Sequence, residues 1–142
     1  MNCEICELYT PEEIKESFSV VKELRTHLSE SEYLDVADEM LARGYRLLAL
    51  KYKGEMVTVA GIEVSMNLYH GRHIWVYDLV TAEKYRSKSY GEKMLKYIED
   101  MARKEGCGIV SLASKFEREG AHRFYEDKMG YEKTGFVFQK KL

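Results

Sequence analysis

The 142-residue sequence has only one proline, one tryptophan and three cysteines, and it lacks a long apolar run. No segment approaches the roughly 18 apolar residues of a membrane-spanning helix, and no secretory leader pattern opens the chain. An excess of basic residues is also missing, because the formal net charge is −2, which argues against nucleic acid as a partner. We therefore expect a soluble, cytoplasmic protein that binds neither a membrane nor nucleic acid.

The cysteines do not indicate a disulfide scaffold, because their number is odd. Cys3 and Cys6 form a C-x-x-C pattern, but residues three apart on a strand point to opposite faces of the sheet. No second pair of cysteines or histidines is close in the sequence, so we expect buried or edge thiols and no metal site. Cys107 follows a glycine that ends a helical pattern and is expected in the core.

The length fits a single domain, residues 1–142, with a core of its own. Charge is unevenly divided along it: residues 1–44 contain 11 acidic and 4 basic side chains, a net charge of −7, whereas residues 45–142 carry +5. This division suits an enzyme that receives a cationic amine on one side and a polyanionic cofactor on the other. The alternative is that two solvated helices happen to be acidic.

Hydrophobic periodicity predicts six strands and four helices. Two capping boxes, at residues 10–13 and 29–32, predict the starts of the first two helices; a third helix follows residue 89, and a fourth covers 121–129. Strands are expected at residues 2–8, 45–53, 56–68, 73–81, 108–114 and 131–140. The order is α/β, with antiparallel strands early and βαβ elements late.

The junction between the fourth strand and the third helix contains an unusual group of basic and small residues: Arg86, Ser87, Lys88, Ser89, Tyr90 and Gly91. Backbone N–H groups at a helix start lack intrahelical partners, and the helix dipole adds partial positive charge. Such a junction is suited to a phosphate or diphosphate. The alternative is an exposed, charged turn in which a serine caps the helix.

A second segment lies beyond the next predicted strand, with Phe124-Tyr125 followed by Met129-Gly130-Tyr131. With both segments in this order, the chain resembles the GNAT superfamily of acetyl-CoA-dependent N-acetyltransferases. That family carries Arg/Gln-x-x-Gly-x-Gly/Ala after its fourth strand and Phe-Tyr-x-x-x-Gly-Phe/Tyr near its end. The resemblance is specific from about residue 78 to residue 131. Ser89 departs from the pattern, because the family has glycine there and serine resists positive φ.

The resemblance implies a fold and a cofactor. The fold is a mixed central sheet of six to seven strands with four helices and a V-shaped split between the fourth and fifth strands. The cofactor is acetyl-CoA, with no metal. Its diphosphate is expected on the residues 86–91 named above, its pantetheine arm on the backbone of Leu79, Val80 and Thr81, and a CoA phosphate within reach of Arg118.

The resemblance also suggests catalytic residues. Tyr125 matches the family tyrosine that protonates the departing thiolate; its alternative is a buried, hydrogen-bonded tyrosine. Asp78 is the candidate base or amine-orienting group, against a structural role, with Glu63 or a water-mediated route as alternatives. His122, beside the motif, is expected to be a surface or packing residue.

The implied reaction is direct acetyl transfer to a primary amine on a small cationic molecule, although a peptide amine stays open. No cysteine nucleophile is expected, so no acyl-enzyme is predicted. A non-catalytic CoA-binding or regulatory module on the same fold is the alternative, and a phosphate binder unrelated to CoA is a third possibility. The sequence leaves the oligomeric state open, a homodimer included.

Overall fold

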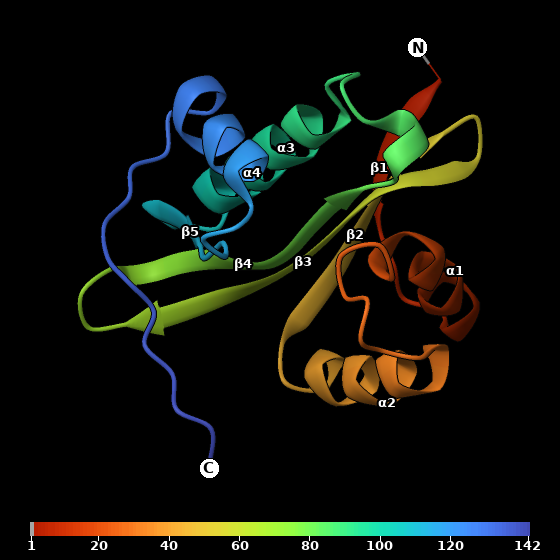
Figure 1. Ribbon diagram of the computed structural model, residues 1–142, viewed down its shortest axis with the longest axis horizontal. Helices are drawn as coiled ribbons and strands as arrows, with labels where there is room; N and C mark the ends of the chain where they lie inside the picture. Colours follow the sequence, from red (N-terminus) through yellow and green to blue (C-terminus); the bar gives the residue numbers. More distant parts are fainter. Residues whose placement is uncertain (1) are drawn as a thin grey trace. The chain divides into compact units, whose positions relative to one another are not determined.

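The computed structural model describes residues 2–142, and its helices and strands are labelled in Figure 1. Four α-helices occur in the described chain, at Pro11–Val21 (α1), Glu30–Leu41 (α2), Tyr90–Lys104 (α3) and Glu119–Arg123 (α4). The strands are Cys3–Glu7 (β1), Tyr45–Tyr52 (β2), Glu55–Asn67 (β3), Gly71–Thr81 (β4) and Ile109–Leu112 (β5). A short 3₁₀ turn at Glu83–Tyr85 and a π-turn at Phe124–Lys128 complete the regular structure.

The chain divides into two compact units, one ending at Ser111 and the other running from Leu112 to Leu142. The first unit contains nearly all of the sheet and the helices α1 to α3. The second contains α4, the π-turn and the C-terminal segment. Each unit is described below by itself.

The sheet has the strand order β1-β2-β3-β4-β5. Neighbouring strands from β1 to β4 are antiparallel, and with β5 the sheet is mixed. The β3–β4 hairpin is its longest pairing and runs from Asn67 opposite Gly71 to Thr58 opposite Thr81. Strand β4 begins at the turn of this hairpin, and its far end leads through the 3₁₀ turn to the loop at residues 86–91.

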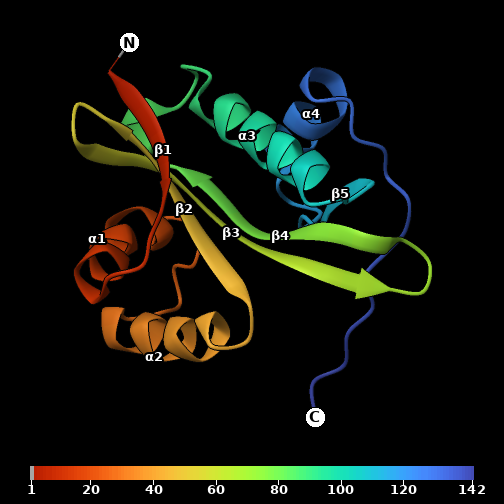
Figure 2. The ribbon, with the colours of Figure 1, turned by 180° about the vertical axis from the view of Figure 1, so that it is seen from behind.

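Helices cover both faces of the sheet within the first unit. Figures 1 and 2 show α1 and α2 together on one face and α3 on the other. Helix α1 packs on β3 and β4, α2 packs on β2, and α3 packs on β3 and β4. The predicted α/β class is therefore confirmed.

Local sequence explains where α1 and α2 begin. Thr10 and Glu13 form a complete capping box at α1, and Ser29 and Glu32 form another at α2. In each box the carboxylate accepts hydrogen bonds from backbone N–H groups, which lowers the pKa of Glu13 and of Glu32 below the ordinary value. Pro11 occupies the first turn of α1, where its missing N–H costs nothing.

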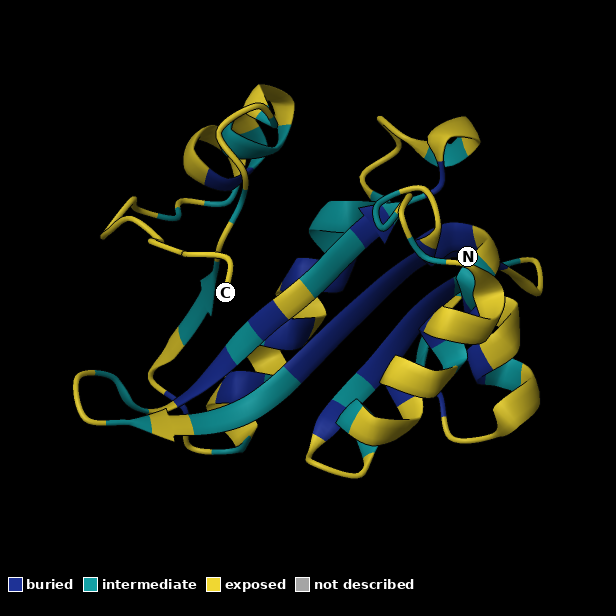
Figure 3. Ribbon diagram, turned by 60° about the horizontal axis from the view of Figure 1, so that its bottom comes forward, coloured by how far each residue is buried: buried dark blue, intermediate teal, exposed yellow. Residues whose placement is uncertain are grey.

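The core lies between the middle strands and the helices, and the buried stretches of β2 and β3 are visible in Figure 3. Seven consecutive residues of β3, 56–62, are buried. On the other side of the sheet, α3 contributes Met94, Leu95 and Ile98, which are all fully buried. A strand that is apolar on both faces needs helices on both faces, and this sheet has them.

The expected strand at residues 131–140 is wrong, and so is the expected number of six to seven strands. Five strands are found among residues 2–142, and no regular structure follows the π-turn. The side chains of Phe136, Val137 and Phe138 are 75%, 72% and 91% exposed. Strand propensity measures how well a side chain fits a pleated, half-buried surface, and without a pairing partner the Phe-Val-Phe sequence does not form a strand.

Gly61 in β3 is required by close packing. A Cβ atom built on Gly61 would overlap the hydroxyl group of Tyr45 on the neighbouring strand, and this hydroxyl hydrogen-bonds to Asp78 at 2.6 Å. Any larger residue must therefore displace Tyr45 and break that bond.

We expect Gly61→Ala to lower the free energy of unfolding by about 2 kcal/mol or more, through overpacking and the lost hydrogen bond. Urea denaturation measures this. Gly108→Ala is the matched control, because a Cβ there meets nothing within 4 Å; its effect should stay within about 0.5 kcal/mol. Equal stability of Gly61→Ala and the parent would contradict the packing argument.

Candidate functional site

The start of α3 is an open helix terminus. Its N-cap residue, Ser89, has φ 69° and makes no side-chain capping bond. The alternative of an exposed, charged turn agrees with the exposure of residues 86–89, although the expected serine capping bond is absent. The first backbone bond of the helix runs from Lys93 N–H to the Ser89 carbonyl. The N–H groups of Tyr90 and Gly91 precede that bond and have no intrahelical acceptor. The backbone at this terminus is therefore uncapped, which is the geometry that the predicted anion site requires.

The loop before this helix adds further conformational and charge features. Ser87 also has positive φ, 64°, and left-handed residues in a loop can turn successive N–H groups into one concavity. Lys88 is exposed and makes no ion pair within the described part of the chain. Arg86, in contrast, donates from Nε to the Thr81 carbonyl at 2.9 Å, and its Nη2 lies 3.4 Å from Glu23 Oε1. Lys88 is thus the available cation, and Arg86 ties the loop to the end of β4.

The end of β4 is held firmly on one side. Residues 79–81 pair with residues 58–60 of β3. Val80 is buried, and the hydroxyl groups of Thr81 and Thr58 lie 2.9 Å apart. The side chains of this segment therefore belong largely to the core, as expected.

The other side of β4 meets β5 near its beginning. Gly108 N–H, just before β5, donates to the carbonyl of Arg72 at the start of β4. Strand β5 has only four residues, whereas residues 79–81 lie seven or more positions beyond Arg72. At about 3.3 Å per residue, β5 is too short to reach the end of β4.

Asp78, the candidate base, is bound on both carboxylate oxygens. Arg25 Nε donates to Oδ1 at 2.9 Å, and the Tyr45 hydroxyl donates to Oδ2 at 2.6 Å. The guanidinium also donates from Nη2 to the carbonyl of Tyr77 at 2.8 Å. Burial, and then the nearby carboxylate, raise the pKa of Tyr45 well above its ordinary value, so Tyr45 stays a hydrogen-bond donor. Asp78 is thus an ion-paired, oriented carboxylate.

A β-bulge explains how two consecutive residues of β4 reach the same place. Ile62 of β3 pairs with Val76 of β4, whereas the residue before it, Gly61, pairs with Asp78. Tyr77, which lies between Val76 and Asp78, is therefore left without a direct partner on β3. Consecutive side chains of a regular strand point to opposite faces. Here both Tyr77 and Asp78 contact the buried tyrosine of β2, by ring packing at 5.8 Å and by a hydrogen bond. The bulge redirects the side chains.

Glu63, the alternative base, lies beside this cluster with an aromatic surrounding. It is paired across the sheet with Tyr45 on one side and Trp75 on the other. The Tyr77 hydroxyl donates to its Oε1 at 3.0 Å. Unlike Asp78, Glu63 has no ion-pair partner among residues 2–142. Of the two carboxylates, Asp78 and Glu63, only Glu63 lacks a positively charged partner among the described residues.

The second unit contains the candidate acid. Tyr125 is 8% exposed and packs against Tyr131 with ring centroids 6.1 Å apart. Desolvation raises the pKa of Tyr125, although the nearby guanidinium of Arg118 acts in the opposite direction. Arg118 therefore interacts with the candidate acid itself. His122 donates from Nε2 to the Lys115 carbonyl, 2.8 Å away, which fits the expected local packing role.

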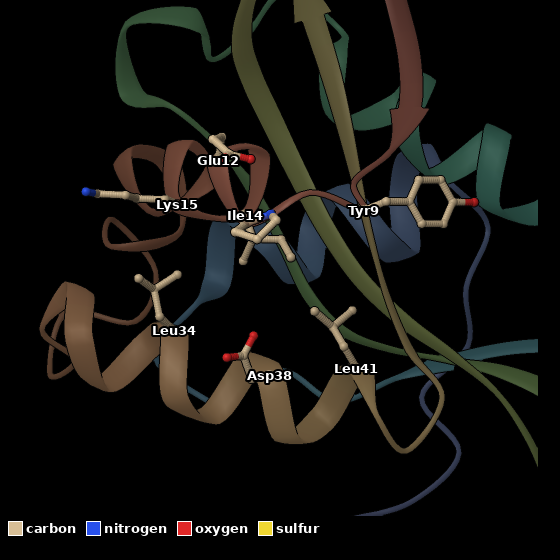
Figure 4. Close-up of a pocket in the computed structure, with 8 residues that line it drawn as sticks. Tyr9, Glu12, Ile14, Lys15, Leu34, Asp38 and Leu41 are labelled. Atoms are coloured by element: carbon tan, nitrogen blue, oxygen red, sulfur yellow. The ribbon is translucent and has the colours of Figure 1, made fainter.

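A cavity of about 490 Å³ lies between α1 and α2. Figure 4 shows Ile14 entering it from α1, with Leu34, Asp38 and Leu41 facing it from α2. The residues that line the cavity do not include Asp78, Arg25 or Tyr45.

Two further expectations concern cysteine and membranes. All three cysteines are free thiols, and Cys107 is buried as expected. Within residues 2–142, no group of three or more His, Cys, Asp or Glu side chains is placed to hold a metal ion. No helix in the described chain has both the length and the apolar character required to cross a bilayer.

Sequence reasoning missed the partners of the candidate residues. Arg25 is 53 positions away from Asp78, and Tyr45 is 33 positions away, so no local spacing signals either contact. Arg118 is only seven positions before Tyr125, but the irregular α4 and π-turn lie between them. Long-range pairing of this kind requires the sheet register, which a single sequence does not supply.

Comparisons with known proteins agree with the geometry. The model of the "Acetyltransferase (GNAT) family" matches residues 4–131. An uncharacterized N-acetyltransferase, YhdJ of Bacillus subtilis strain 168, is 39% identical over 135 residues, which cover 94% of this chain and 95% of that protein.

Solved structures share the fold at low identity. The aminoglycoside N-acetyltransferase AAC(6')-Iy in complex with CoA has a TM-score of 0.85 at 12% identity, covering 99% of this chain and 94% of that one. A transcriptional regulator from Bacillus halodurans C-125 has a TM-score of 0.82 at 18% identity, with 99% of both chains covered. The family match over most of the sequence, together with the open terminus of α3 after β4, shows that this chain belongs to the GNAT family of acetyltransferases.

Proposed function

We propose that this protein transfers an acetyl group from acetyl-CoA to a primary amine on a small cationic molecule, and that its two units act as one N-acetyltransferase domain. The observation that carries the proposal is the open N-terminus of α3, reached from β4 through two left-handed serines. A helix terminus of this kind binds diphosphate through backbone N–H groups and the helix dipole.

The loop residues have different proposed roles in binding the cofactor. The N–H groups of residues 87–91 bind the diphosphate, and Lys88 adds a charge-assisted contact. Arg86 acts mainly by holding the loop in place through its bonds to Thr81 and Glu23. Its guanidinium must give up these two bonds before it can contact a phosphate. Arg118 is proposed to serve the candidate acid as well as a CoA phosphate, because its guanidinium already interacts with Tyr125.

The pantetheine arm binds along the end of β4. Residues 79–81 are paired with β3 on one side, while β5 begins beside Arg72 and has four residues. This arrangement supports an exposed backbone edge at Leu79, Val80 and Thr81, to which an amide chain can add like a strand. It is also what the V-shaped split between β4 and β5 requires.

The chemical step is direct aminolysis of the thioester. The amine nitrogen attacks the acetyl carbonyl, the carbon–sulfur bond breaks, and the CoA thiolate takes a proton from the Tyr125 hydroxyl. The nitrogen loses its own proton to a carboxylate or to water. Burial raises the pKa of Tyr125, which keeps the phenol protonated at neutral pH and available as a donor.

Asp78 is proposed to orient the amine. Each of its oxygens already accepts one bond from Arg25 or Tyr45, which fixes the carboxylate and partly neutralises its charge. A remaining lone pair on either oxygen can accept a hydrogen bond from the acceptor nitrogen. The attacking nitrogen is proposed to lose its proton to water, which is the third route that the sequence left open.

Charge and the related structures support a small cationic acceptor. The net charge of −7 over residues 1–44 attracts cations toward α1 and α2. The aminoglycoside N-acetyltransferase with the same fold has been solved with CoA and with a bisubstrate analogue, CoA-S-monomethyl-acetylneamine. Such analogues join a small amine acceptor to the coenzyme.

The function is tested by the release of free CoA thiol from acetyl-CoA in the presence of a panel of primary amines. The proposal expects amine-dependent thiol release together with one acetylated product per thiol. Tight CoA binding without turnover on any amine would favour the non-catalytic module instead. Competition by ATP as effective as that by CoA would favour a general phosphate binder.

Ser89→Gly should stabilise the folded protein. The ligand-free backbone already has φ 69° at Ser89, which costs serine about 1 kcal/mol. Glycine removes this penalty in the free and the CoA-bound protein alike, so we expect a higher free energy of unfolding in urea and a nearly unchanged Kd for CoA. Ser89→Ala is the control, because it removes the hydroxyl but keeps the Cβ atom. If alanine stabilised the protein as much as glycine, backbone strain would not be the cause.

Tyr125→Phe should slow turnover without loss of the cofactor. Removal of a general acid typically costs about 100-fold or more in kcat, whereas the Kd for CoA should change little. In the parent enzyme, ionisation of this phenol should reduce kcat only above the pH range in which an ordinary tyrosine ionises, because burial raises its pKa. Stopped-flow rates against pH measure both effects. An unchanged kcat in Tyr125→Phe would remove Tyr125 from the mechanism.

A further inference from the structure

The first unit carries an acidic and aromatic group of side chains on β3 and β4, formed by Glu63, Trp75 and Tyr77. Glu63 lies opposite Trp75 in the sheet register. The rings of Trp75 and Tyr77 meet edge to face with centroids 6.4 Å apart. Tyr77 is 40% exposed, and both Glu63 and Trp75 are partly exposed. We call this group the Glu63 subsite.

The carboxylate of the subsite is fixed but not neutralised. Its Oε1 accepts the Tyr77 hydroxyl at 3.0 Å, and burial, then this same bond, raise the pKa of Tyr77, so the phenol stays a donor. Its Oε2 lies near Gly44, since a Cβ atom built on that glycine would be 3.7 Å away, an ordinary van der Waals distance. No lysine, arginine or histidine among residues 2–142 forms an ion pair with Glu63.

The two arginines near this group already have acidic partners. Arg25 is bound to Asp78 and to the Tyr77 carbonyl, and Arg43, next to Gly44, is paired with Glu39 at 3.1 Å. The local balance therefore leaves one negative charge, on Glu63. A carboxylate flanked by aromatic faces matches an organic ammonium, which gains an ion pair and cation–π contacts together.

We propose that Glu63, Trp75 and Tyr77 bind an ammonium group of the acceptor that is not the nitrogen to be acetylated. The inference rests on the proposed acetyl transfer. Glu63 and Gly61, the partner of Asp78, are two residues apart on β3, a separation of about 7 Å. A molecule anchored at Glu63 by one nitrogen can thus present a second nitrogen toward Asp78 and the end of β4.

The geometry therefore selects a class of substrate: amines with two nitrogens joined by a short alkyl chain. The chain lies along the rings, and the anchored nitrogen stays charged. The second nitrogen loses its proton and attacks the thioester. A monoamine of equal length can either occupy the subsite or attack, but it cannot do both.

The test compares diaminopentane with pentylamine as acceptors for the parent and for Glu63→Gln. We expect the parent to prefer diaminopentane in kcat/KM. In Glu63→Gln the KM for diaminopentane should rise about tenfold or more, as expected for the loss of a charge-assisted contact, with kcat and the Kd for CoA nearly unchanged. Tyr77→Phe, which removes only the bond that orients the carboxylate, should raise the same KM by a smaller factor.

Glu16→Gln is the matched control, because Glu16 is an exposed acid of α1 and its replacement changes the net charge equally. It should leave the preference for diaminopentane intact. An equal loss in Glu16→Gln and Glu63→Gln would assign the effect to the general acidic field and overturn the subsite. An unchanged KM in both Glu63→Gln and Tyr77→Phe would also overturn it.

Calorimetry of diaminopentane binding to the CoA-bound protein separates this inference from the proposed function. Weaker binding to Glu63→Gln than to the parent supports the subsite even if no amine is acetylated, in which case only the acetyl-transfer proposal fails. Acetylation of both amines at equal kcat/KM, with equal diaminopentane affinity in parent and variant, leaves the enzyme in place and removes the subsite.

Discussion

The proposed cofactor site depends on the N–H groups at the first turn of α3. Helices α1 and α2 cover their own termini with capping boxes, whereas α3 begins at a left-handed serine that offers no side-chain cap. The strand before it is fixed in the core by its pairing with β3 and by the Arg86–Thr81 bond. An uncapped terminus that follows a strand fixed in this way is suited to the proposed diphosphate, because ordering it costs little when the ligand binds.

The bulge in β4 is the second constraint, and it follows from a few residues packed closely together. Gly61 makes room for Tyr45, and Tyr45 and Arg25 together hold Asp78. This arrangement brings Tyr77 and Asp78 to one place, just before the segment proposed to bind pantetheine. In the proposed mechanism the same strand positions the acceptor and the cofactor, so that their relative placement depends on the register of β3 and β4.

The sequence predicted the parts of the molecule that local chemistry determines. The capping boxes at Thr10 and Ser29 and the position of the β4–α3 junction are all signalled within a few residues. The contacts of Asp78 were not predictable, because they depend on side chains 33 and 53 positions away. The Phe-Val-Phe segment near residue 137 was misjudged for the opposite reason: its propensity is local, but a strand exists only where another strand pairs with it.

The account depends above all on diphosphate binding at the start of α3. The most direct measurement is the change in backbone amide NMR signals as CoA is titrated into the ¹⁵N-labelled protein. We expect the largest shifts at Lys88, Ser89, Tyr90 and Gly91, with smaller changes along residues 79–81. If these amides stayed unchanged while CoA bound and shifted signals elsewhere, the diphosphate site, and the acetyl-transfer geometry built on it, would be wrong.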